Sequence, residues 1–135
     1  MFLLDTNIVS ELRKPKPHRG VIAWVTAQDG TSLYLSAMTI AEIQRGVEMA
    51  RQQDSQKARQ IKTWLEELMV TGQLLAVDAA VCREWARLMH RRSETLVEDA
   101  FLAATARVHR LVVVTRNVRD FKTLGVETLN PFERK

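Results

Sequence analysis

The sequence predicts an α/β fold, a three-layer α/β/α sandwich around a central parallel sheet. Short, fully apolar runs such as Leu111–Val114 are typical of strands that are buried on both faces. Longer segments with apolar residues three and four apart lie between these runs and predict helices. Strands that alternate with helices favour parallel pairing through right-handed crossovers. The length of 135 residues suits a single domain over 1–135.

The amino-terminal half is predicted to alternate strands and helices around one cationic loop. Strands are expected over 1–4 and 33–35, and helices over 6–12, 21–28, 37–50 and 54–69. The segment Lys14–His18 holds two prolines and cannot continue a helix, because proline lacks a backbone donor and fixes the backbone. Ser36 has the side chain of an N-cap, and Gly72 is expected to end the fourth helix.

The carboxy-terminal half repeats this alternation. Strands are expected over 74–77, 111–114 and 127–129, with helices after Asp78 and over 99–109 and a polar loop over 91–95. Asp78 immediately precedes a helical pattern, so capping of that helix explains it. The helix over 99–109 is almost entirely apolar and should be buried on most sides.

Composition restricts the class of protein. The formal net charge of +4 fits either simple solubility or a polyanionic partner such as nucleic acid, and charge alone does not decide. No apolar run approaches the ~20 residues of a membrane span, and nothing resembles a secretory signal, so we expect a cytoplasmic protein. The single cysteine, Cys82, has no ligand-spaced neighbours and is expected to be a buried or half-buried structural thiol.

Carboxylates follow the predicted strands at the edge where an open parallel sheet binds ligands. Asp5 ends the first strand, Glu42 lies in the helix after the second, Asp99 opens the helix before the fourth, and Asp120 follows the fourth. Taken singly, each has a plain alternative as a helix cap, a turn residue or a solvated side chain. If the first and fourth strands are neighbours, all four share one crevice.

Clustered carboxylates imply a cation. Two like charges ~4 Å apart repel by about 4 kcal/mol at an effective dielectric near 20, so they take up protons or bind a metal. Ligands that are all oxygen suit Mg²⁺ or Mn²⁺, which can bind a phosphate oxygen and activate a water. Hydroxyls and amides that could orient water or phosphate lie beside the acids: Thr6, Asn7, Thr115 and Asn117.

Four motifs in order carry a resemblance to a known family. They are LDTNIVSEL (4–12), SAMTIAEIQRGVE (36–48), DAFLAATA (99–106) and VVVTRNVRDF (112–121), followed by the ending GVETLNPF (125–132). Together they cover essentially the whole chain. The sequence resembles a PIN-domain ribonuclease of the VapC toxin type, from type II toxin–antitoxin systems.

The resemblance implies a Mg²⁺- or Mn²⁺-dependent endoribonuclease that a cognate VapB-type antitoxin holds inactive. The family's acids correspond to Asp5, Glu42, Asp99 and Asp120, with Asp5 and Asp99 the surest metal ligands and the fourth acid the most variable. The family often has a proline or small residue near 97–98, where this chain has Glu98, an acid that could alter the charge at the pocket rim or face solvent, and we expect it to face solvent. The resemblance also implies a homodimer and a toxin–antitoxin complex that binds operator DNA through the antitoxin.

The basic and aromatic residues have less specific interpretations. Arg116 adjoins the proposed site and is the best candidate to contact an RNA phosphate. The other arginines considered are better explained as solvated helix residues: Arg45, Arg51, Arg91, Arg92 and Arg119. Trp24, Trp64 and Trp85 follow helical apolar patterns and are expected in the core or at a dimer contact.

Three alternative functions compete with this interpretation, and residue identity weakens the first two. A haloacid dehalogenase-type phosphatase needs a second aspartate where this chain has Asn7. A receiver-type signalling domain needs an acidic pair after the first strand and a lysine after the fifth, and this chain has neither. A non-enzymatic nucleic-acid-binding protein would tolerate amides in place of the four acids.

Overall fold

The computed structural model describes residues 1–90, 92 and 96–133 as five short strands and seven α-helices with short 3₁₀ turns. The strands are β1 (Phe2–Leu4), β2 (Leu33–Ser36), β3 (Leu74–Leu75), β4 (Val112–Val114) and β5 (Thr128–Leu129). The helices are α1 (Thr6–Arg13), α2 (Arg19–Ala27), α3 (Ala37–Arg51), α4 (Ser55–Thr71), α5 (Ala79–Met89), α6 (Val97–His109) and α7 (Val118–Thr123). Two 3₁₀ turns used below are η1 (Gly30–Ser32) and η3 (Pro131–Glu133).

All five strands are parallel and lie in the order β3-β2-β1-β4-β5. The prediction that the first and fourth strands are neighbours is confirmed, since Leu3 pairs with Val113 in β4 and with Tyr34 in β2. The strand order reverses between β1 and β4. This switch point is where open α/β sheets bind ligands, outside the carboxyl ends of the strands.

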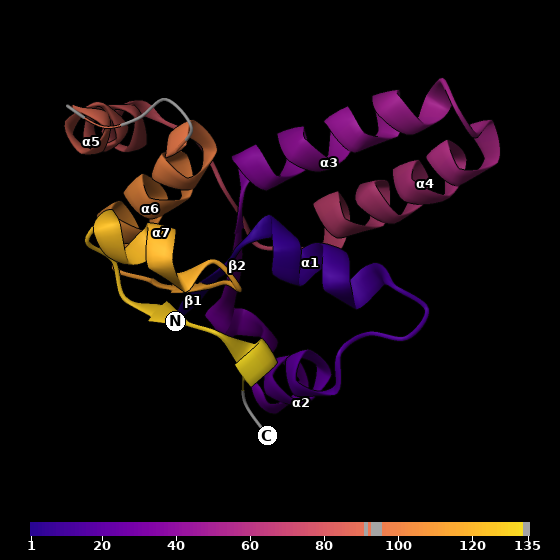
Figure 1. Cartoon of the computed structure of the whole chain (residues 1–135), viewed down its shortest axis with the longest axis horizontal. Helices are drawn as coiled ribbons and strands as arrows, with labels where there is room; N and C mark the ends of the chain where they lie inside the picture. The colour runs from indigo at the N-terminus through magenta and orange to yellow at the C-terminus, as the bar shows by residue number, and fades with distance from the viewer. Residues whose placement is uncertain (91, 93–95, 134–135) are drawn as a thin grey trace.

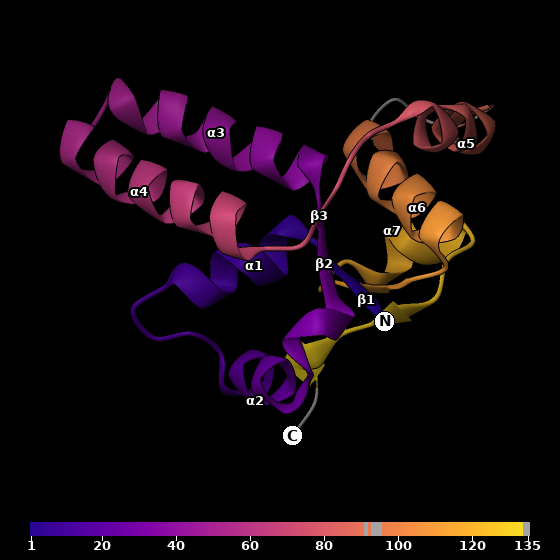
Figure 2. The same ribbon diagram turned by 180° about the vertical axis from the view of Figure 1, so that it is seen from behind.

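Adjacent side chains of one strand enter different cores. Leu3 and Val113 belong to a buried cluster with α5, α6 and α7, whereas Leu4 and Val114 belong to a cluster with α1, α2, α3 and α4. This follows from the two-residue period of a strand. Figures 1 and 2 show the α3–α4 hairpin on one side of the sheet and α5, α6 and α7 on the other, which confirms the three-layer prediction.

Several predicted boundaries differ by a few residues. The strand expected over 74–77 is only two residues long, because β3 is an edge strand that pairs with β2 alone. The helix α2 begins at Arg19, before the predicted residue 21, because the His18 ring accepts a hydrogen bond from the Gly20 amide and caps it. The helix α6 begins two residues before Asp99, which therefore lies in its first turn.

The cap and break predictions are confirmed. Ser36 Oγ accepts from the Met38 amide at 3.0 Å, and Asp78 Oδ1 accepts from the Val81 amide at 3.0 Å. Gly72 follows the last residue of α4, and a Cβ at this position would lie 2.7 Å from the Leu68 carbonyl oxygen.

The prediction for Cys82 is wrong, because its side chain is exposed. Val81 and Leu88 supply the buried face of α5, and Cys82, one residue beyond Val81, is rotated about 100° from it. The three tryptophans pack against the cores as expected, and Trp85 stacks on Phe101 with ring centroids 4.7 Å apart.

Two further expectations concern the loop over 91–95 and membrane spans. The predicted polar loop over 91–95 lies outside the described residues, apart from Arg92, which is exposed. Among the described helices, none combines the length and apolar character that crossing a bilayer requires.

Candidate acidic active site

Asp5 is a buried carboxylate at the carboxyl end of β1, and it also caps α1. Its Oδ1 accepts from the Thr6 amide at 2.7 Å, while Oδ2 accepts from the Thr115 hydroxyl at 2.8 Å and from the Asn7 amide at 3.1 Å. Its backbone N–H continues the sheet by donating to the Val114 carbonyl. Burial nevertheless raises the pKa of Asp5 above its ordinary value, although all three donors favour the ionised form.

Asn117 joins two further acids to this group. Its side-chain amide donates to Asp120 Oδ2 at 2.8 Å and to Asp99 Oδ2 at 3.2 Å, and its backbone N–H donates to the Thr115 hydroxyl at 2.8 Å. The Thr115 hydroxyl in turn donates to Asp5. One hydrogen-bonded network therefore connects Asp5, Asp99 and Asp120, which are up to 115 positions apart in the sequence.

Glu42 approaches the network from α3. Burial, together with the charges of Glu98, Asp5 and Asp99, raises the pKa of Glu42 to about 7, and the Thr6 hydroxyl opposes the rise. In Figures 1 and 2 the amino-terminal ends of α1, α3 and α6 come together above the carboxyl ends of β1 and β2. The sheet edge and these helix ends thus bring Glu42 within electrostatic reach of Asp5 and Asp99.

Asp99 has a similar environment in the first turn of α6. Burial, together with the charges of Asp5, Asp120 and Glu98, raises the pKa of Asp99 to about 6, against the hydrogen bond from Asn117. Glu98 is half-exposed, as expected, and lies 3.7 Å from Arg45 Nη1. It also contributes charge to the site, because it raises the pKa values of both Glu42 and Asp99.

The hydroxyls and amides predicted to orient substrate face the acids. Asn7, Thr115 and Asn117 all donate to the carboxylates, and the Thr6 hydroxyl donates to Thr39 Oγ1 at 3.1 Å. Arg116 is 59% exposed, and its backbone N–H donates to Asn7 Oδ1 at 3.4 Å. Four of the five predicted residues therefore hold the site's own groups in place, and Arg116 is the one whose side chain faces outward.

Two residues that the sequence reasoning did not select also belong to this region. Glu11 is buried at 6% exposure, and Phe132 in η3 places its ring against the Arg116 guanidinium. Glu11 was present in the motif 4–12, and its position one turn after the apolar pair Ile8–Val9 was the only signal that it is buried. No local pattern in the sequence indicates that the carboxy-terminal Phe132 folds back to Arg116.

The donor set fits a hard divalent cation in its chemistry. It offers carboxylate oxygens, which Mg²⁺ and Mn²⁺ prefer, and three of its acids have pKa values raised by burial, two of them also by mutual repulsion that a cation would relieve. Within the described part of the chain, no three or more His, Cys, Asp or Glu side chains are grouped so that they could hold a metal ion. Asp99 and Asp120 instead share the Asn117 amide.

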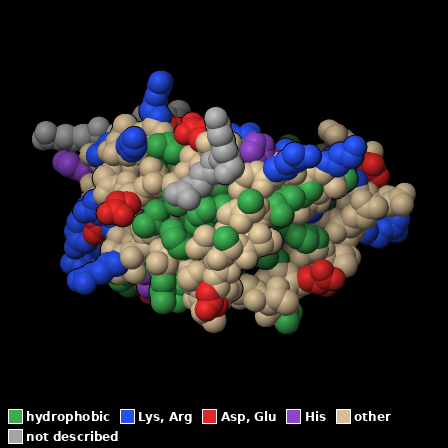
Figure 3. Space-filling model, turned by 90° about the horizontal axis from the view of Figure 1, so that it is seen from below, with side chains coloured by type: hydrophobic (Ala, Val, Ile, Leu, Met, Phe, Trp, Pro, Cys, Tyr) green, Lys and Arg blue, Asp and Glu red, His purple; other side chains and the backbone are tan. Residues whose placement is uncertain are grey.

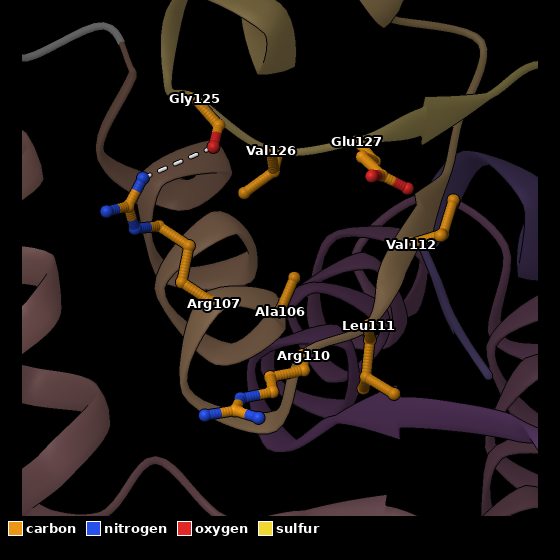
Figure 4. Close-up of a pocket in the computed structure, with 8 residues that line it drawn as sticks. All are labelled: Ala106, Arg107, Arg110, Leu111, Val112, Gly125, Val126 and Glu127. Carbon is orange, nitrogen blue, oxygen red and sulfur yellow. Dashed lines mark hydrogen bonds between the residues drawn. The ribbon is translucent and has the colours of Figure 1, made fainter.

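One hollow on the described surface lies elsewhere. It has a volume of about 250 Å³ and is formed by residues before and at the start of β4 and before β5, as Figure 4 shows. Arg107 in this hollow already donates to the Gly125 carbonyl at 3.2 Å and to Glu84 at 3.1 Å. Figure 3 views the molecule from below, where apolar side chains cover much of the face and acids lie scattered singly. The only acid lining the hollow is Glu127, so we assign the chemistry to the acidic cluster.

The acidic cluster at the switch point of a parallel sheet defines an α/β domain whose candidate site lies where open sheets of this kind bind ligands. Comparison with known proteins identifies the family. The model of the PIN domain matches residues 2–126. The chain therefore belongs to the PIN-domain family, among the VapC-type toxins of toxin–antitoxin systems.

Individual relatives match over nearly the full length. VapC ribonuclease Y4jK of Sinorhizobium fredii is 36% identical over 98% of this chain and 99% of its own, and toxin FitB of Neisseria gonorrhoeae is 32% identical over the same shares. The crystal structure of FitAcB from Neisseria gonorrhoeae matches with a TM-score of 0.86 and 31% identity, over 98% of this chain and 99% of that one. A related FitAB structure, with a TM-score of 0.85 and 30% identity over 100% of this chain and 98% of that one, is bound to a DNA fragment.

Proposed function

We propose that this toxin is an endoribonuclease that hydrolyses RNA phosphodiester bonds with Mg²⁺ or Mn²⁺ at the site of Asp5, Glu42, Asp99 and Asp120. The observation that carries the proposal is the network through Thr115 and Asn117 that gathers Asp5, Asp99 and Asp120 at the switch point. A relative 36% identical to the chain is a VapC ribonuclease, which supports RNA as the substrate class. The proposed site of action is the cytoplasm.

Asp5 and Asp99 are proposed as the main metal ligands, with Glu42 and Asp120 completing the acidic centre. The bound ion would supply Lewis-acid chemistry, namely activation of water and stabilisation of the leaving oxygen. Thr115 and Asn117 hold the carboxylates in place by donating to them, and the Thr6 hydroxyl supports the ionised form of Glu42. Arg116 at the rim would bind an RNA phosphate, which helps to offset the repulsion between RNA and four acids.

The proposed partner is a VapB-type antitoxin that covers the acidic centre, in a complex that binds operator DNA through the antitoxin. The similarity to the FitAB complexes, one of them on DNA, supports this assignment. We also propose that the toxin forms a homodimer. Co-purification with the product of an adjacent small reading frame, followed by light scattering, should give a complex with two copies of this chain. A monomer that no such product binds would refute the partner proposal.

The cleavage test uses the purified chain with structured RNAs in Mg²⁺, Mn²⁺ and EDTA. We expect metal-dependent internal cleavage that Asp5→Asn and Asp99→Asn each reduce by at least about 100-fold, because removal of a positioned electrostatic group typically costs this much. Glu66→Gln is the matched control, since Glu66 is an exposed acid on α4 that pairs only at 3.9 Å with Lys62. Cleavage that persists in EDTA or in both site variants would refute the proposed centre.

A further inference from the structure

Arg116 is in contact with two side chains that come from opposite ends of the chain. Its guanidinium carbon lies 3.8 Å from the centroid of the Phe132 ring, which is a close cation–π contact. Its Nη2 lies 4.0 Å from Glu11 Oε1. Glu11 belongs to α1 and Phe132 to the last turn, η3.

Glu11 is a fixed anion. Its Oε1 accepts from Lys14 Nζ at 2.9 Å, and its Oε2 accepts from the His18 backbone N–H at 2.9 Å. These two hydrogen bonds, more than the nearby charges of Lys14 and Arg116, lower the pKa of Glu11, so it stays ionised at neutral pH. The same contacts hold the Lys14–His18 loop against α1. Glu11 therefore provides a rigid negative partner on one side of Arg116.

Phe132 provides a flat apolar partner on the other side. Pro131 is buried, and the Phe132 amide donates to Asn130 Oδ1 at 3.0 Å, which sets the direction of this last turn. The Phe132 ring also lies 5.1 Å, centroid to centroid, from the His18 ring in the segment that enters α2. The ring therefore lies between a fixed backbone turn and the His18 ring, and the Arg116 guanidinium lies over its face.

We propose that Glu11 and Phe132 are positioning residues that hold the Arg116 guanidinium ready to bind an RNA phosphate beside the acidic centre. This inference rests on the proposed ribonuclease function. Arg116 follows Thr115, whose hydroxyl binds Asp5, so its backbone is fixed next to the reacting groups. Its side chain is still 59% exposed and keeps donors free for a ligand. A pre-oriented planar guanidinium loses less conformational entropy when it binds a phosphate than a mobile one does.

The test measures RNA binding and cleavage with variants of Phe132. Phe132→Leu keeps an apolar side chain in the core but removes the aromatic face, and Phe132→Tyr restores the face. We expect Phe132→Leu to raise KM about threefold to fivefold with little change in kcat, which corresponds to an exposed cation–π contact. Phe132→Tyr should stay close to wild type. A change in kcat alone, or an equal effect of both variants, would contradict the inference.

A double-mutant cycle separates this role from general stability. Arg116→Ala should weaken RNA binding and reduce the slope of log Kd against log salt by about 0.7, the value for one phosphate contact on a single strand. If Phe132 acts through Arg116, Phe132→Leu adds nothing in the Arg116→Ala background. Glu11→Gln should raise KM in the wild type and likewise add nothing in that background. Additive effects would overturn the proposal.

An NMR measurement reports on the contact between Phe132 and Arg116 without RNA. The ring current of Phe132 should shift the Arg116 side-chain proton resonances, and the shift should disappear in Phe132→Leu and return in Phe132→Tyr. A wild type with the unshifted values of a free arginine would refute the inference.

If wild type cleaves RNA and the Arg116 variants bind it normally, the inference fails and the proposed function stands. If wild type neither binds nor cleaves RNA, both fail.

Discussion

Replacement of Glu42 by glutamine is expected to stabilise the metal-free protein at high pH and to have no such effect at low pH. Burial and neighbouring acids raise the pKa of Glu42 from 4.5 to about 7 in the folded state. For an acid with a raised folded pKa, the folded state binds more protons than the unfolded state between the two values, so stability falls as pH rises. The cost of the charge is complete above about pH 7 and absent below about pH 4.5.

The size of the effect follows from the same shift. At about 1.4 kcal/mol for each pKa unit, the change from 4.5 to about 7 corresponds to about 3 kcal/mol at full strength. Because the carboxyl is only partly buried, we reduce this by half for solvent screening, to about 1.5 kcal/mol. For a chain of 135 residues this corresponds to a rise in Tm of about 5 °C.

The assay is urea and thermal unfolding in EDTA at pH 8 and pH 5, with wild type, Glu42→Gln and the exposed control Glu66→Gln. Glu42→Gln should exceed wild type at pH 8, and the difference should shrink as the pH approaches 5. The control should stay within about 0.5 kcal/mol of wild type at both values. An equal difference at both pH values, or a loss of stability at pH 8, would refute the electrostatic reasoning.

Three other predictions test separate parts of the site and fold. Millimolar Mg²⁺ or Mn²⁺ should raise Tm in a thermal melt, because a ligand at 100 times its Kd stabilises the folded state by about 2.7 kcal/mol. The rise should be smaller in Asp99→Asn. An unchanged Tm over a wide range of metal concentrations would count against the site. Thr115→Val removes a donor to Asp5 and an acceptor for the Asn117 backbone N–H. The free energy of unfolding in urea should therefore fall by about 1–3 kcal/mol. An unchanged free energy of unfolding would argue against the network. Cys82 should react with a thiol reagent in the folded protein as one thiol per chain, whereas reaction only after unfolding would contradict its exposure.

Much of the fold could be predicted because the strands are short and apolar. Leu111–Val114 has no polar residue, which predicts burial on both faces, and the structure places Val113 and Val114 in opposite cores. The sequence could not predict that Cys82 faces solvent. The apolar pattern of α5 identifies the buried face only through Val81 and Leu88, and a small neutral residue beside that face fits either side.

The candidate site was predictable at the level of strand ends. Asp5 and Asp120 follow strands that end at one edge, and Glu42 and Asp99 lie near the amino-terminal ends of helices at the same edge, so the sheet order and these helices bring the four acids to one region. The role of Asn117 depends on the directions of three side chains, which no spacing in the sequence specifies. The contact between Arg116 and Phe132 depends on the path of the chain after β5. Because β5 has only two residues, its sequence gives little indication of that path.

The distribution of donors explains why the acids in this site differ. Asp5, the most buried, accepts hydrogen bonds from Thr6, Asn7 and Thr115, which partly offset the burial that raises its pKa. Asp99 has the Asn117 amide, which it shares with Asp120. Because a positive ion gains most where anions have the fewest donors, we expect a cation to change the ionisation of Asp99 and Glu42 more than that of Asp5. Carboxyl NMR titrations with and without Mg²⁺ would measure this order directly, and a larger metal-induced pKa shift at Asp5 than at Asp99 would reverse it.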